Sequence, residues 1–120
     1  MQGQNQTEEL EQALLGALLL SNQSLQKIEN GLSPDHFFIP VHGRIFEAIQ
    51  TLTERGSVAN PLTLNAFFKD DEALSDVGGP AYLTGLVASA ATIIATPDYA
   101  KAVTEGFVRR ELAEIGETIA

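Results

Sequence analysis

Apolar residues recur along most of the chain at steps of three and four residues, which is the period of an amphipathic α-helix. The clearest run predicts a helix that begins at Pro40 or Val41, because proline suits the first turn of a helix. Gly56 follows the last apolar position and predicts the end of this helix, since glycine readily adopts the left-handed conformation of a helix C-terminus. The positions predicted to share one buried face are Ile45, Phe46, Ile49 and Leu52.

The same period predicts further helices on both sides of this one. Thr7 is a suitable N-cap for a first helix that ends near Leu20, and its apolar positions cover most of the circumference, which predicts the central helix of the fold. Gly16 within it is expected to permit close packing. A second helix is predicted at residues 22–30, and Thr63 is predicted to cap a further turn of helix. Another helix is predicted to begin at Pro80, after Gly78 and Gly79. A long helix is predicted to begin at Thr96, Pro97 and Asp98.

The segments between these helices have their own signals. Pro34 and Pro40 bracket an aromatic stretch that predicts an ordered loop, and we expect its phenylalanines and the later pair to be buried in the core. These four aromatic residues are Phe37, Phe38, Phe67 and Phe68. Residues 88–95 mix alanines with β-branched residues and are expected to form a loop or a frayed helix.

The alternation typical of strands and the dipeptides typical of hairpins do not occur in the sequence. The prediction is therefore an all-α fold, a compact multi-helix orthogonal bundle. We expect residues 1–6 to be a disordered tail and residues 7–105 to be the globular domain.

Composition narrows the classes of function. The length of 120 residues and the hydrophobic content of 44% favour one folded domain with its own core. The net charge is -9 and the basic residues are scattered, which argues against direct binding of nucleic acid. The absence of cysteine and the short apolar run at residues 13–20, far below a membrane span, fit a cytoplasmic protein without membrane attachment.

No arrangement of residues predicts catalysis or the binding of a cofactor or metal. Gly78 and Gly79 lack the lysine of a phosphate-binding loop and are interpreted as a helix-breaking turn. His36 and His42 lack the spacing of a helical zinc site, so we expect one or both to lie at the loop and helix N-terminus and to donate a hydrogen bond to a backbone carbonyl. The acidic residues near the N-terminus, Glu8, Glu9 and Glu11, are interpreted as solvated. The chain itself is therefore not expected to be an enzyme.

The final helical pattern carries the candidate interface. Its apolar positions near the end of the chain are Phe107, Leu112, Ile115 and Ile119. They either contact a second copy or a partner protein, or they pack back on this domain or on a following helix. Because the pattern runs to the last residue without a stop signal, we interpret the sequence as a fragment that ends within a helix.

Several motifs together resemble the N-terminal domain of the bacterial replicative DNA helicase, the hexameric DnaB-type family. The most specific is the stretch LSPDHFFIPVHGRIFEAI at residues 32–49, and EQALLGALLLSN at residues 11–22 precedes it. The spaced element Gly78-Gly79 followed by Ala81-Tyr82-Leu83 also matches, as do Pro61-Leu62-Thr63 and Arg109 to Leu112.

The resemblance implies a helical domain that continues at residues 106–120 into the start of a helical hairpin. It also implies self-association in pairs around a hexameric ring and binding of primase, and it makes a helicase loader a further candidate partner. The ATP and Mg²⁺ of the full-length helicase would belong to a C-terminal motor that unwinds DNA and that these residues do not include. The alternatives are a helicase-binding domain of a primase and, from another class, a small helical metal-dependent enzyme that uses His36 and His42.

Overall fold

The computed structural model describes residues 2–28, 31–69, 71–90 and 95–119, and its secondary structure there consists of helices joined by turns and short loops. Side chains are described for residues 6–28, 31–69, 71–90 and 95–116. The six α-helices are α1 (Gln2–Leu20), α2 (Pro40–Glu54), α3 (Pro61–Phe67), α4 (Glu72–Val77), α5 (Pro80–Ser89) and α6 (Thr96–Ile119), and two 3-10 helices are η1 (Asn22–Lys27) and η2 (Pro34–His36). The described part contains no strand, and the predicted all-α bundle is confirmed.

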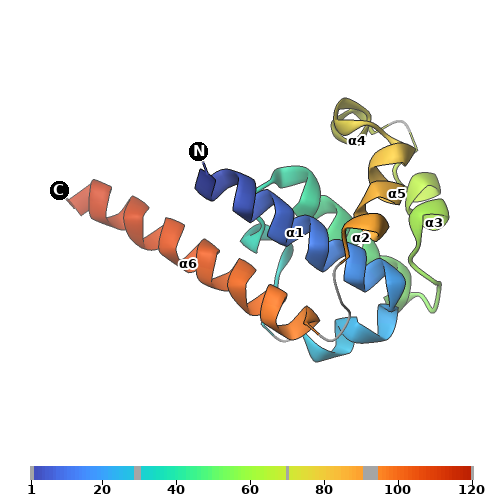
Figure 1. The fold of residues 1–120 in the computed structure, drawn as a ribbon, viewed down its shortest axis with the longest axis horizontal. Coiled ribbons are helices and arrows are strands. Elements are labelled where there is room, and N and C mark those ends of the chain that lie inside the picture. The colour runs from blue at the N-terminus through green and yellow to red at the C-terminus, as the bar shows by residue number, and fades with distance from the viewer. Residues whose placement is uncertain (1, 29–30, 70, 91–94, 120) are drawn as a thin grey trace.

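Helix α1 is the central helix, as its apolar circumference predicts. Figure 1 shows α1 surrounded by α2, α5 and α6, and it contacts all three of these helices. Leu14, Leu15 and Leu18 are fully buried. Gly16 faces α5 so closely that an added Cβ would lie 1.9 Å from the Leu86 carbonyl oxygen, which confirms the predicted close packing.

Helix α2 follows its sequence pattern. Pro40 occupies the first turn, and Ile45, Phe46 and Ile49 are fully buried against α1 and α3. Gly56 has a φ of 80°, the left-handed conformation expected just beyond a helix end. The sequence pattern therefore determined this helix from its first turn to its stop.

Helix starts and types depart from the prediction in three places. Helix α1 begins at Gln2, so residues 2–6 are helical where a disordered tail was predicted, and Thr7 lies within the helix where an N-cap was predicted. The segment predicted as a helix at 22–30 is the 3-10 helix η1, which ends at Lys27, while residues 29–30 lie outside the described part. Helix α3 is capped by Asn60, whose side chain accepts from the Thr63 N–H, so Thr63 completes a capping box and is not the cap.

Two of the four phenylalanines predicted for the core are exposed. Phe37 and Phe68 are buried, whereas Phe38 and Phe67 lie largely at the surface. Adjacent residues in a turn or a short helix point in different directions, so only one member of each pair can face the core. The predicted loop or frayed helix at 88–95 is helical through Ser89, and residues 91–94 lie outside the described part.

The predicted turn and restart at Gly78, Gly79 and Pro80 are confirmed. Both glycines have positive φ, and Pro80 is in the first turn of α5. The long helix α6 is also confirmed, and Figure 1 shows its C-terminal half extending away from the rest of the domain. No helix among the described residues is long and apolar enough to span a membrane.

Candidate functional site

A buried polar cluster joins three helices at the centre of the domain. Glu11 on α1 is 1% exposed and His42 on α2 is 0% exposed. The Glu11 carboxylate lies 2.8 Å from His42 Nδ1, and His42 Nε2 contacts the hydroxyl of Tyr82 on α5. Gln12 donates to the same hydroxyl over 3.3 Å. The prediction that Glu11 is solvated is therefore wrong.

The Glu11 carboxylate also caps the start of α2 from another helix. It accepts from the backbone N–H of Phe38 at 2.6 Å and from that of Ile39, the N-cap residue, at 3.2 Å. Because α2 has no side-chain cap of its own, this carboxylate supplies the negative group that a helix N-terminus favours. One side chain thus fixes the entry into α2 against α1.

The hydrogen-bonding groups of the cluster are mutually satisfied. His42 Nδ1–H donates to the carboxylate, His42 Nε2 is hydrogen-bonded to the Tyr82 hydroxyl, and that hydroxyl accepts from Gln12. Among the described side chains, no buried nitrogen or oxygen lacks a partner. Since Glu11 and His42 have almost no contact with solvent, a substrate could not reach them, and the cluster is structural.

The histidines lie at the loop and at the start of α2 as predicted, but among the described residues none of their ring hydrogen bonds is made to a backbone carbonyl. His36 Nδ1 accepts from the Ser33 N–H at 3.2 Å and closes a capping box around η2. The Ser33 hydroxyl donates to the Asp35 carboxylate, and this bond holds the pKa of Asp35 below its ordinary value. Among the described residues, no three histidine, aspartate or glutamate side chains gather in a way that could hold a metal ion.

The pKa of Tyr82 is raised above its ordinary value, first by burial of the hydroxyl and further by the charges of Glu8 and Glu11. A raised pKa in the folded state means that folding favours the neutral phenol. The contribution of the neutral Tyr82 phenol to stability is therefore complete below about pH 10, and it is lost as the pH rises through the folded-state pKa. We predict that Tyr82→Phe loses less stability than the wild type as the pH rises from about 9 to about 12 in denaturant unfolding.

Tyr99→Phe is the matched control for this measurement, because Tyr99 is also partly buried but lies outside the cluster. It is expected to keep the alkaline loss of the wild type. An equal loss in wild type and Tyr82→Phe would contradict the coupling of Tyr82 ionisation to folding.

Helix α6 rests on the loop at residues 31–38 through three of its side chains. The Thr104 hydroxyl donates to the Gly31 carbonyl at 3.3 Å, and the Phe107 ring lies 4.6 Å from the His36 ring. Arg110 donates to the His36 carbonyl at 3.0 Å and lies over the exposed Phe38 ring. These contacts fix the direction in which α6 leaves the domain.

Beyond Arg110 the apolar side of α6 is open. Leu112 is 62% exposed and Ile115 is 52% exposed, and Val108 beside them is also exposed. Phe107 is half-buried against His36, and the side chain of Ile119 lies outside the described part. The structure thus brings Leu112 and Ile115 together on one surface and turns Phe107 toward the domain.

Sequence reasoning missed the cluster of Glu11, His42 and Tyr82 and the roles of Arg110 and Val108. The fold brings Glu11, His42 and Tyr82 together from α1, α2 and α5. A carboxylate inside an otherwise apolar helix, as in EQALLGALLL, is the signal that could have revealed Glu11.

Residues 3–105 match the sequence profile of the family described as the DnaB-like helicase N terminal domain. The chain belongs to this family. The replicative DNA helicase DnaB of Rickettsia felis is 37% identical over 109 residues, which are 91% of this chain and 22% of that protein. The replicative DNA helicase DnaC of Bacillus subtilis is 35% identical over 115 residues, which are 96% of this chain and 25% of that protein. The chain therefore spans about a quarter or less of the curated relatives.

Solved structures of the DnaB-like family share the fold. The N-terminal domain of DnaB helicase from Mycobacterium tuberculosis has a TM-score of 0.86 and 32% identity, over 92% of this chain and 80% of that one. A DnaB-like replicative helicase, studied with its interactions with primase, has a TM-score of 0.75 and 30% identity, over 93% of this chain and 26% of that one. The resemblance stated from sequence motifs is confirmed.

Proposed function

We propose that this DnaB-family domain is an assembly and primase-docking domain of a replicative DNA helicase. It would self-associate in a hexameric ring and bind primase, and a helicase loader is a further candidate partner. DNA unwinding, with ATP and Mg²⁺, would belong to a motor domain of the whole protein. The domain itself would bind neither DNA nor a cofactor.

The observation that carries this proposal is the open apolar surface of α6 on a domain of this family. Val108, Leu112 and Ile115 follow at steps of four and three, so they form one exposed stripe. Exposed apolar stripes of this kind favour contact with another helix. The net charge of -9 disfavours a phosphate backbone as the partner.

Docking of primase is supported by the similar fold of a DnaB-like replicative helicase whose structure was studied together with its interactions with primase. The relatives are helicases, and this favours the present proposal over a helicase-binding domain of a primase. Isothermal titration of this chain with the primase of the same organism tests docking. Absence of heat and of co-sedimentation at about 100 μM would argue against it.

We predict that Leu112→Asp weakens self-association about tenfold or more. Burial of one leucine side chain in an interface contributes about 1.5–3 kcal/mol, and a carboxylate there would have to be desolvated. Sedimentation equilibrium of wild type and variant measures the change.

Leu62→Asp is the matched control. Leu62 is 81% exposed on α3, which Figure 1 places at the opposite side of the domain from the end of α6. It should associate like the wild type. If Leu112→Asp also does, the stripe is not the association surface.

A further inference from the structure

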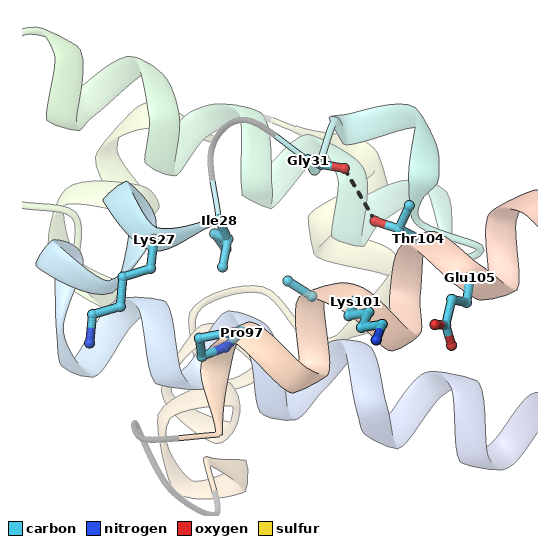
Figure 2. A pocket seen from close by; sticks show the side chains of 8 residues that line it. Lys27, Ile28, Gly31, Pro97, Lys101, Thr104 and Glu105 are labelled. Atoms are coloured by element: carbon cyan, nitrogen blue, oxygen red, sulfur yellow. Dashed lines mark hydrogen bonds between the residues drawn. The ribbon is translucent and has the colours of Figure 1, made fainter.

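A groove with an apolar floor lies between η1 and the first half of α6. Its volume is about 400 Å³, and Ile28, Pro97 and Ala100 contribute its apolar lining. Figure 2 shows Lys27 on the η1 side and Lys101 on the α6 side of this groove. Because sites for small ligands measure about 300–1,000 Å³, a groove of this size fits a short peptide segment.

The two walls of the groove are fixed to each other. Ile28 from the η1 side and Ala100 from α6 are both buried members of the hydrophobic core. The Thr104 hydroxyl on α6 donates to the Gly31 carbonyl at 3.3 Å, and Figure 2 shows this bond across the groove. The walls are therefore already in place, and a ligand would not have to order them on binding.

The lysines at the rims of the groove are available to carboxylates. Within the described part of the chain, neither Lys27 nor Lys101 forms an ion pair or a side-chain hydrogen bond, whereas Arg44 pairs with Asp71. Acidic residues outnumber basic ones by 16 to 7 in the whole sequence. An acidic segment would be repelled by the net charge of the chain and attracted locally by these two lysines.

The charges also give the groove a direction. Glu105 lines it one helical turn beyond Lys101 on α6, a rise of about 6 Å. A carboxylate of a bound segment is favoured between Lys27 and Lys101 and disfavoured beside Glu105. The groove therefore selects a segment whose acidic end lies between the two lysines.

We propose that this groove binds a short acidic and apolar segment of a partner protein. Large aliphatic side chains of the segment contact the apolar floor, and its carboxylates pair with Lys27 and Lys101. The proposed function places no partner in this groove, so this inference goes beyond it and does not depend on it.

Fluorescence anisotropy tests the groove with the labelled peptide Asp-Asp-Leu-Leu-Asp-Asp at about 50 mM salt, where exposed charges are weakly screened. The wild type is expected to bind this peptide with a dissociation constant below about 500 μM. Lys27→Gln/Lys101→Gln is expected to weaken binding about fivefold or more, because it removes both charge pairs. Glu105→Gln is expected to tighten binding about twofold, because it removes a like charge.

The matched control is Arg55→Gln/Lys69→Gln, which removes the same charge at exposed positions outside the groove. It should bind the peptide within about twofold of the wild type. The peptides Asn-Asn-Leu-Leu-Asn-Asn and Asp-Asp-Ser-Ser-Asp-Asp lack the charges or the apolar side chains, and each should bind about fivefold or more weakly.

Three results would overturn the proposal. The first is equal binding by Lys27→Gln/Lys101→Gln and the control, and the second is equal binding of the asparagine peptide and the aspartate peptide. The third is a bound fraction that falls as the chain concentration rises, because a second copy of the chain would then cover the groove.

Discussion

Glu11→Ala is expected to destabilise the domain by about 3–5 kcal/mol, because it leaves three donors of a buried polar cluster without their acceptor. The substitution removes the acceptor of two backbone N–H groups at the start of α2 and of His42 Nδ1. Each unsatisfied buried donor costs about 1–3 kcal/mol. Because small domains are stable by only about 5–15 kcal/mol, the variant should be close to unfolding. Urea unfolding followed by circular dichroism measures the loss.

Glu9→Ala is the matched control on the same helix, because Glu9 is exposed. Its effect should stay within about 0.5 kcal/mol. A loss of less than about 1 kcal/mol in Glu11→Ala would mean that the carboxylate does not fix the entry into α2. Glu11→Gln should fall between the two, since the amide keeps one acceptor oxygen but loses the charge.

Gly16→Ala is expected to destabilise the domain by about 3 kcal/mol or more. An added Cβ would lie 1.9 Å from the Leu86 carbonyl oxygen and 2.8 Å from its carbon, and both are backbone atoms. Relief of this contact requires α1 and α5 to separate, which would open the core around Leu83 and Leu86. Thermal and urea unfolding both report the effect.

Gly85→Ala is the control for this substitution, since Gly85 lies within α5 and an added Cβ there meets nothing within 4 Å. It should stabilise the domain by about 0.5–1 kcal/mol through the helix propensity of alanine. Equal stability of Gly16→Ala and the wild type would contradict the close approach of α1 and α5.

Local sequence signals predicted helices well where the signal and the structure depend on the same few residues. Pro40 and Gly56 bound α2 because a fixed φ suits a first turn and a positive φ suits the residue past the last one. Gly78, Gly79 and Pro80 separate α4 from α5 for the same reasons. Cap identity was less predictable, since Asn60 and Thr63 both suit the role and their mutual hydrogen bonds decide it.

The candidate association surface was predicted in part. The spacing of Leu112 and Ile115 showed that they share a helix face, but the pattern could not show whether another element covers that face. Phe107 follows the same pattern and is turned toward His36. The association role of these residues remains a prediction that Leu112→Asp tests.

The sequence by itself determined the all-α class, the principal helices and membership of the DnaB-like family, because helix period, stop signals and contiguous motifs are local properties of the chain. Only the tertiary structure decided which polar residues are buried and which apolar residues stay open. The sequence pattern predicts a solvated Glu11. In the fold, α1 lies beside the start of α2, and the Glu11 carboxylate accepts hydrogen bonds there from a backbone N–H group and from His42. The physical reason is that desolvation and hydrogen-bond partners depend on neighbours distant in sequence, which helical periodicity does not encode.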